Sequence, residues 1–370
     1  MTPGQIALRA VIVGFIMALV VVTGFAYTTL LERKLLARLQ ARVGPNRAGY
    51  IPLPQRGKKE RKLLGGILQP AADAVKLFFK EDPTPAKVDR VVYNLAPMLA
   101  VIPAILILAV IPWAGEINIF GAKFSPYFAI APGINVGAIF ILAVTSIGVY
   151  GIVLGGWASN SKYAILGGIR ASAQMISYEL AMGLAILIPV MMSGSMDMGV
   201  ITADQPNIWN WYVWRQPVAA IIFWIAAMAE LQRHPFDLLE AEQELSAGFN
   251  VEYAGMRFGM FFMAEYMKMV SLSAIAAILF FGGYQGPFVE QFPALGFLYL
   301  AIKIIIGLMV MIWMRASWPR FRYDQLMQFG WKRLLPIIVL NFIVTAVYFV
   351  LLDAGKLPPF IGTLHQFFTG

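Results

Sequence analysis

Long apolar runs, recurring along nearly the whole chain, limit what this sequence can fold into. Of its 370 residues, 59% are hydrophobic and only 13% are charged, far from the balance of a soluble domain. A helix of about 20 apolar residues crosses a bilayer, and several runs approach or exceed that length. We therefore predict an all-α polytopic membrane protein that forms one membrane domain over residues 1–370. Eight transmembrane helices are predicted, at about 9–31, 92–113, 134–156, 171–193, 216–231, 257–283, 295–315 and 333–353.

The distribution of basic residues predicts how these helices are oriented. The connections after the first, third, fifth and seventh helices carry 23 of the 29 Lys and Arg residues. Cytoplasmic loops are enriched in these residues, so both termini are predicted on the periplasmic side of a bacterial inner membrane. Basic cytoplasmic loops also explain the net charge of +9 better than binding to nucleic acid does. The first apolar run lacks a cleavage site and is predicted to be a retained span.

The composition argues against most cofactors on this chain. Cysteine is absent, which excludes disulfides, thiolate metal sites and iron–sulfur ligation by its own residues. The two histidines, His234 and His365, lie far apart in the sequence, which argues against a haem or metal held by a histidine pair. We predict neither a metal nor a bound redox cofactor.

The longest connection, between the first two predicted spans, contains an amphipathic helix over about 64–80. Apolar residues recur there at intervals of three or four, and Asp73, Lys76 and Lys80 lie on the opposite side. A proline at position 70 indicates where this helix is kinked or begins. Being too short to cross the bilayer, it is predicted to lie along the inner membrane surface, to pack on a partner subunit, or both.

Ionisable residues inside the predicted spans are costly and often functional. Glu179 lies about 13 Å into its helix at 1.5 Å per residue, with no basic residue one turn away, and is a candidate proton-relay group. A buried structural carboxylate is the alternative. Glu265 and Lys268 are three residues apart and are predicted to pair with each other. Lys303 has no partner in its own span and must find one elsewhere or face water.

Six acids lie at the end of the fifth predicted span and in the connection after it, and Arg233 is the only full positive charge among them. Asp237, Glu240 and Glu244 fall on one helical face if this segment is helical. Carboxylates that repel one another raise each other's pKa, as a proton-exchanging site requires. A solvated acidic loop is the alternative, but interleaved aromatic and leucine side chains favour partial burial. The six acids are Glu230, Asp237, Glu240, Glu242, Glu244 and Glu252.

Four stretches together resemble one known family. They are Glu32–Asn46 with Gln69–Leu77, then Gly156–Glu179, then Ala229–Tyr266, and finally Arg315–Leu326. In order and in register, these motifs are similar to the membrane subunit of proton-pumping NADH:quinone oxidoreductase (respiratory complex I) that is called H in bacteria and 1 in mitochondria.

The resemblance implies a subunit that walls the quinone tunnel at the junction with the peripheral arm and couples quinone reduction to proton translocation. No residue of this chain would be catalytic. The implied partners are the peripheral-arm quinone-site subunits, the small and antiporter-like membrane subunits, lipid and quinone, with FMN, iron–sulfur clusters and NADH in partner subunits. The implied tunnel and junction residues are Glu32, Arg33, Arg38, Asp73, Phe236, Arg315 and Arg320. The implied proton-coupling acids are Glu179, Glu230, Asp237, Glu240, Glu242, Glu244 and Glu252.

Some positions depart from the family pattern. Leu231-Gln232 stands where Thr-Asn is usual, and His234 stands where a small residue or proline is usual, so no side-chain role carries over there. Residues 51–64 look like an insertion whose basic side chains contact lipid head groups or another subunit. Two alternative functions remain: the homologous subunit of a membrane-bound hydrogenase, and a stand-alone secondary transporter. The transporter predicts inverted repeats, which the sequence does not display.

Overall fold

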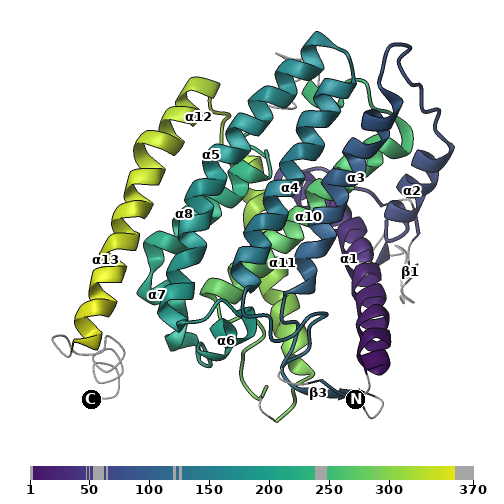
Figure 1. Cartoon of the computed structure of the whole chain (residues 1–370). Helices are drawn as coiled ribbons and strands as arrows, with labels where there is room; N and C mark the ends of the chain where they lie inside the picture. Colours follow the sequence, from purple (N-terminus) through teal and green to yellow (C-terminus); the bar gives the residue numbers. More distant parts are fainter. Residues whose placement is uncertain are drawn as a thin grey trace.

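The protein is a bundle of long helices, seen here in a computed structural model (Figure 1). The structure describes residues 3–46, 48–49, 51–52, 62–63, 66–119, 122–124, 127–237, 248–289 and 291–354. The long helices are α1 (Pro3–Leu39), α3 (Arg90–Leu106), α4 (Gly137–Ala158), α5 (Lys162–Ser193), α10 (Gly255–Phe280), α11 (Leu295–Ser317) and α13 (Leu335–Asp353). The shorter ones are α2 (Gln69–Phe79), α6 (Met198–Ala203), α7 (Tyr212–Arg215), α8 (Pro217–Glu230) and α12 (Tyr323–Phe329).

Connections between the helices hold the remaining elements. Two small antiparallel pairs join β1 (Ile51–Pro52) to β2 (Lys62–Leu63) and β3 (Ile117–Ile119) to β4 (Ala122–Phe124). Short 3-10 turns cover Ile107–Ala109, Ile208–Asn210 and Gly248–Asn250. A π-helical turn at Gly330–Leu334 joins α12 to α13.

Among the described residues, six helical segments are long and apolar enough to cross a membrane. They are Arg90–Ala109, Gly137–Ala158, Lys162–Ser193, Gly255–Phe280, Leu295–Ser317 and Tyr323–Leu352. The predicted all-α polytopic membrane protein is thereby confirmed, whereas the number of eight spans stays a prediction. Helix α8 is apolar but only 14 residues long, in keeping with the short fifth run in the sequence.

Local sequence signals explain where several helices begin and end. The Asp89 side chain caps α3 by accepting hydrogen bonds from the backbone amides of Val91 and Val92. Pro70 lies in the first turn of α2, where the missing N–H costs no helical hydrogen bond. Gly194, with φ of 65°, ends α5 in the left-handed conformation.

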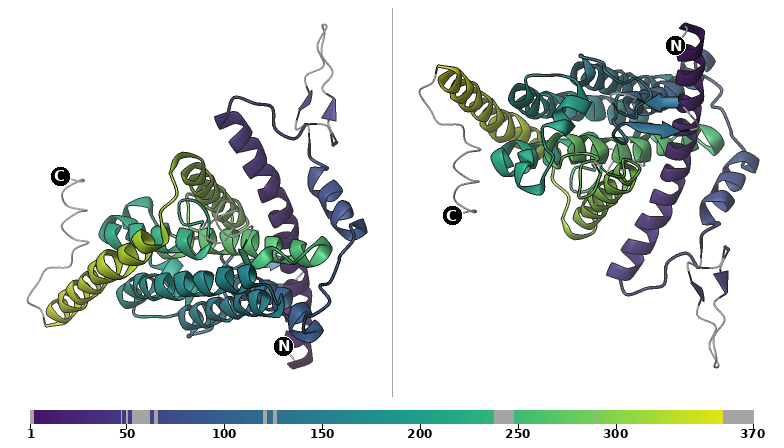
Figure 2. Two further views of the ribbon diagram at one scale, coloured as in Figure 1. Left: turned by 90° about the horizontal axis from the view of Figure 1, so that it is seen from above. Right: turned by 90° about the horizontal axis from the view of Figure 1, so that it is seen from below.

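Helix α10 is the centre of the bundle and α13 lies at its edge. In the apolar stretch of α10, 83% of the residues are buried inside the protein. In the apolar stretch of the segment that contains α13, the share is 17%. Helix α10 packs against α1, α2, α3, α8 and α11. Viewed along the bundle, α1 and α2 flank one side and α13 diverges on the opposite side (Figure 2). Helix α1 begins and α13 ends at the same end of the bundle (Figure 1).

Candidate functional site

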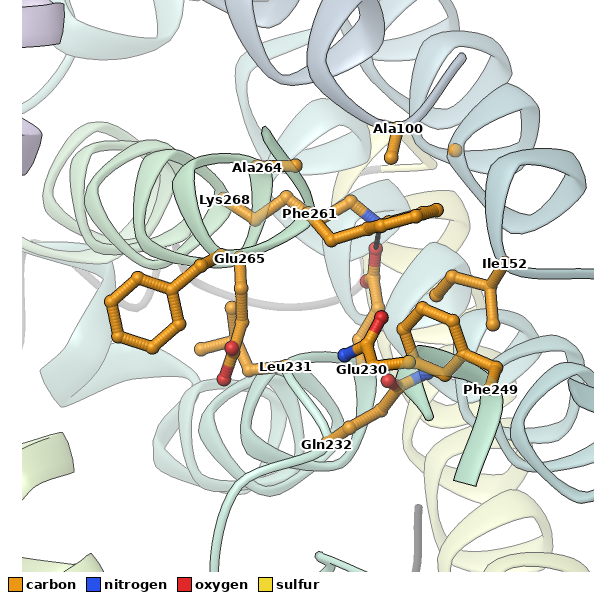
Figure 3. Close-up of a pocket in the computed structure, with 13 residues that line it drawn as sticks. Ala100, Ile152, Glu230, Leu231, Gln232, Phe249, Phe261, Ala264, Glu265 and Lys268 are labelled. Atoms are coloured by element: carbon orange, nitrogen blue, oxygen red, sulfur yellow. Dashed lines mark ion pairs between the residues drawn. The ribbon is translucent and has the colours of Figure 1, made fainter. Parts of the chain in front are cut away.

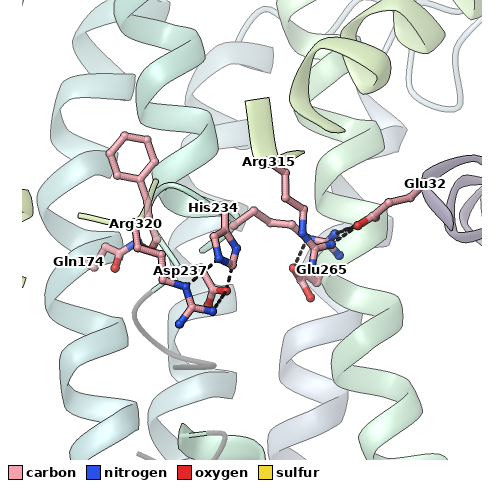
Figure 4. Close-up of polar contacts among 9 residues, drawn as sticks. Glu32, Gln174, His234, Asp237, Glu265, Arg315 and Arg320 are labelled. Atoms are coloured by element: carbon pink, nitrogen blue, oxygen red, sulfur yellow. Dashed lines mark hydrogen bonds and ion pairs between the residues drawn. The ribbon is translucent and has the colours of Figure 1, made fainter. Parts of the chain in front are cut away.

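Four charged side chains from four segments meet beside α10. One guanidinium nitrogen (Nη1) of Arg233, just beyond α8, donates to both carboxylate oxygens of Glu32 on α1, at 2.9 and 2.7 Å. The Nε of Arg233 donates to Glu265 on α10, and Arg315 on α11 donates to the same Glu32 carboxylate. We call Glu32, Arg233, Glu265 and Arg315 the Arg233 cluster (Figure 4). Two acids and two bases make it formally neutral.

Burial makes this cluster strongly electrostatic. Arg233 is only 6% exposed and Glu32 only 3%, and charges interact more strongly where water is excluded. The guanidinium of Arg233 also lies 4.2 Å from the ring centroid of Tyr266, a cation–π geometry. Burial lowers the pKa of Arg233, but Glu265 and Tyr266 together raise it by more, so the pKa lies above its ordinary value.

His234, Asp237 and Arg320 form a second group next to the Arg233 cluster (Figure 4). Arg320 donates from Nε to His234 Nε2 at 2.7 Å and from Nη2 to Asp237 at 3.2 Å. The Nδ1 of His234 lies 3.1 Å from Asp237 Oδ2, close but without hydrogen-bond alignment. Burial lowers the pKa of His234; Asp237 opposes this, and the cations Arg320 and Arg233 lower the pKa further. The imidazole is therefore neutral at pH 7, as an acceptor of the Arg320 hydrogen bond must be.

The turn that carries these residues is held from α5 by one buried amide. Gln174 donates from Nε2 to the backbone carbonyls of Ala229 at 2.8 Å and Phe236 at 2.9 Å. The ring of Phe236 stacks on that of Phe321, at 5.7 Å between centroids. Residues 229–236 are thus fixed between α5 and the segment after α11, which orients Glu230, Arg233 and His234.

A further row of charged groups lies deeper in the bundle. The Lys268 ammonium on α10 lies 3.9 Å from Glu230 Oε1 at the end of α8, and both side chains are buried. Gly148 on α4 makes room for that ammonium, because a Cβ there would lie 3.0 Å from Nζ. On α5, Glu179 accepts hydrogen bonds from Ser146 at 2.5 Å and Thr145 at 3.2 Å. It lies close enough to Glu230 for the two charges to interact.

A cavity opens between Glu230 and Lys268 (Figure 3). It offers about 50 Å³ to the centres of water molecules. Its polar lining consists of Glu230, Gln232, Asn250, Glu265 and Lys268, and its apolar lining includes Ile152, Phe249 and Phe261. The turn that bears Asn250 packs closely on α5 because Gly167 has no side chain: a Cβ there would lie 2.8 Å from the Cα of Gly248.

Other residues predicted from the sequence lie outside these groups. Arg33 and Asp73 form an ion pair at 2.6 Å that ties α1 to α2. Arg38 is exposed near the end of α1. Glu252 lies apart from the other acids, where its backbone carbonyl accepts a 2.6 Å hydrogen bond from Tyr93. Phe236 is buried and is not among the residues that line the cavity.

The predicted helical face of acids falls partly outside the described residues. Glu240, Glu242 and Glu244 lie in 238–247, which the structure does not describe, so their predicted roles stay predictions. Asp237 ends the preceding described stretch and is not in a helix there. Most of the 51–64 insertion also lies outside the described ranges.

The predicted pairing of Glu265 with Lys268 is wrong. Glu265 pairs with Arg233 and Lys268 pairs with Glu230, because a partner on a neighbouring helix is available to each. Lys303, which has no charged partner in its own predicted span, donates hydrogen bonds to the backbone carbonyls of Gly283 and Gln285. Sequence reasoning left Arg233 without a role, although a single base among six acids was a usable signal.

The described residues contain no group of three His, Asp or Glu side chains placed to hold a metal ion. What they do contain is a series of buried and half-buried acids and bases that reaches from Glu32 through the Arg233 cluster to Lys268, Glu230 and Glu179. Such an arrangement can hold charge, shift protons between carboxyls and respond electrostatically to a charge placed near one end.

Comparison with known proteins gives a consistent result. A family model described as NADH dehydrogenase matches residues 12–346. An H subunit of the NADH-quinone oxidoreductase of Geobacter metallireducens is 46% identical over 345 residues, covering 91% of this chain and 93% of the relative. The corresponding H subunit of Protochlamydia amoebophila is 47% identical, covering 89% and 94%. That of Thermomicrobium roseum is 44% identical, covering 89% and 93%.

Proposed function

Since the chain belongs to the NADH dehydrogenase family, as the H subunit of an NADH-quinone oxidoreductase, we propose that it walls the quinone site and couples quinone reduction to proton translocation. The peripheral-arm subunits would dock on it and carry NADH, FMN and the iron–sulfur clusters. Small and antiporter-like membrane subunits would lie beside it. Quinone would be a substrate of the assembled complex, and the chain itself would contribute positioning and charge.

One observation carries this proposal, namely the series of buried and half-buried ionisable groups described above. Buried charges are expensive in a membrane protein and persist mainly where they are paired or functional. A stable fold alone does not require so many, because apolar packing is often as stabilising as a buried ion pair. The series begins at the Arg233 cluster, where residues that the family resemblance assigns to the quinone tunnel, Glu32 and Arg315, are found.

Electrostatics supplies the coupling in this proposal. Reduction of quinone to quinol takes up two electrons and two protons, so its intermediates change the local charge. Among closely spaced acids in a water-poor environment, a charge at one end changes the proton affinity of the next. Glu265, Lys268, Glu230 and Glu179 would carry that change from the Arg233 cluster toward the neighbouring membrane subunits. Glu240, Glu242 and Glu244 belong to the same proposal by sequence.

Neutralising single acids tests the proposal. Glu179→Gln and Glu230→Gln keep side-chain volume and hydrogen-bonding ability, so the complex should assemble and still oxidise NADH with an artificial acceptor. Quinone-dependent turnover and proton uptake into vesicles should both fall, by about ten-fold or more for a relay group. We expect the same of Glu240→Gln. Glu116→Gln, at an exposed site in another connection, is the control. Parental pumping by the Glu179 and Glu230 variants would show that these acids are structural.

A further inference from the structure

Three residues that line the cavity between Glu230 and Lys268 each have a buried side-chain atom without a hydrogen-bond partner in the described part of the chain. These atoms are Oε2 of Glu230, Nε2 of Gln232 and Oδ1 of Asn250. The Glu230 side chain is 3% exposed, so its free oxygen is not compensated by bulk solvent. An unsatisfied buried polar group costs about 1–3 kcal/mol, and three in one place need an explanation.

The ionic contact across this cavity is also incomplete. The 3.9 Å between Lys268 Nζ and Glu230 Oε1 is too long for a hydrogen bond. The contact therefore leaves the Lys268 ammonium free to donate to water as well as to attract Glu230. The lysine ammonium carries three donors, so it can serve a water molecule and Glu230 together.

The size of the cavity suits water. A single water occupies roughly 10–15 Å³ and needs two to four polar partners, so the 50 Å³ open to water centres has room for a few molecules. A quinone head group is far too large. The unpartnered atoms are one amide donor, one amide acceptor and one carboxyl oxygen, a mixture that water, both donor and acceptor, satisfies.

We propose that this cavity holds a cluster of ordered water molecules and that Gln232 and Asn250 are positioning residues that orient the cluster against the Glu230 carboxyl. The inference rests on the proposed function, because it concerns how Glu230 exchanges its proton. Amide groups neither gain nor lose protons near neutral pH. They therefore hold the water in one orientation whether Glu230 is charged or neutral.

Proton release from Glu230 then follows a simple path. The O–H bond of the carboxyl breaks, a bond to the oxygen of the nearest water forms, and that water passes one of its other protons to the next. The carboxylate left behind is stabilised by the Lys268 ammonium. Return of a proton along the same water molecules restores the carboxyl, so no other reactant is consumed.

The proposal predicts water density in the intact complex. A cryo-EM map at a resolution that shows ordered water should contain a few such molecules within hydrogen-bond distance of Gln232, Asn250 and Glu230. A dry cavity, or one filled by a side chain, would overturn the proposal. This result does not depend on pumping. Parental pumping by Glu230→Gln would therefore refute the proposed function and leave the water site standing.

Variants test the positioning role. Gln232→Leu and Asn250→Leu keep similar volume but offer no polar atom to the water. Gln232 has φ of 55°, which strains glutamine and leucine alike, so the change adds no backbone strain of its own. Loss of one hydrogen bond should slow quinone-dependent turnover about five-fold. It should also increase the solvent isotope effect, which is the ratio of turnover in H₂O to turnover in D₂O. NADH oxidation with an artificial acceptor should not change.

Two further variants separate positioning from folding. Gln232→Asn keeps the amide and should restore most of the turnover and the parental isotope effect, even if Gln232→Leu assembles poorly. Asn207→Leu makes the same kind of change at an exposed site near α7 and should have no effect. If Gln232→Leu and Asn250→Leu both show parental turnover and isotope effects, the amides do not position water and the proposal fails.

Discussion

At the scale of single residues, Arg233 faces carboxylates from two different helices. It pairs with Glu32 on α1 and with Glu265 on α10, and Arg315 supplies a second cation to Glu32. Removing one member of such a group leaves an uncompensated buried charge, which costs more than the pair itself contributes. Loss of Arg233 would therefore affect two carboxylates at once.

We expect Arg233→Met to destabilise the protein by about 3–5 kcal/mol, because Glu265 would lose its ion pair while Glu32 would keep only Arg315. The measurement is the thermal unfolding of the detergent-purified complex, together with the fraction of this chain that assembles. Arg322→Met, which removes a largely exposed guanidinium that pairs with Asp324, is the matched control and should change little. Equal melting of both variants would contradict a structural role for the buried pairs.

Residue identities could be predicted from the sequence more fully than residue partners. The family resemblance named Glu32 and Arg315, the run of six acids named Glu230, and the structure places all three in the series of charged groups. Their contacts join positions 32, 233 and 315. These positions lie so far apart in the sequence that no local pattern predicts that they meet. The cavity was likewise not foreseeable, since it depends on how Gly167 lets a turn approach α5.

At the scale of elements, helix α2 presents an exposed apolar face. Val75, Phe78 and Phe79 are all exposed, while Asp73 on the other side is tied to Arg33 of α1. The apolar periodicity of this helix was visible in the sequence, but its attachment to α1 and α10 was not. A short helix with an apolar face suits the membrane interface, and we propose that the hydrophobic tail of a quinone enters there.

A charge on that face tests the entry role. Val75→Asp and Phe78→Asp should weaken the use of long-tailed quinones several-fold and leave short-tailed analogues nearly unaffected, because only the long tail must pass an apolar surface. Steady-state KM values for the two kinds of quinone provide the measurement. Lys76→Glu places a new carboxylate on the polar side of α2 and serves as the control. Equal losses for both quinones would argue for a purely structural helix.

At the scale of the whole molecule, the apolar runs predict that the chain is a helical membrane protein but not which helix lies at its centre. Helix α10 has the lowest mean hydropathy of the six long segments and is the most buried of them. In a membrane the outer helices face lipid, which is itself apolar, whereas polar side chains find partners only inside. Hydropathy therefore finds the helices but misjudges their depth in the bundle.

The predicted orientation can be tested because the chain has no native cysteine. A cysteine in place of Lys162, in the first turn of α5, should react with an impermeant thiol reagent only from the cytoplasmic side. A cysteine in place of Asn207, near α7, should react only from the periplasmic side. Intact cells and inverted vesicles give the two measurements. Labelling of both positions from one side would contradict the predicted topology, since they lie at opposite ends of the bundle (Figure 1).

The Arg233 cluster also has a consequence for how the protein is made. Glu32 precedes Arg233 by 201 residues and Arg315 by 283, and ribosomes add about 5–20 residues per second. The Glu32 carboxyl therefore spends roughly 10–40 s at the membrane before its first basic partner is translated. A lone carboxylate inside the bilayer is costly, and Glu32, one residue beyond the predicted first span, can stay in the head-group layer until then. Docking of α1 against α10 is thus a late event in biogenesis, because the ribosome synthesises Glu32 long before it synthesises the basic residues that pair with it.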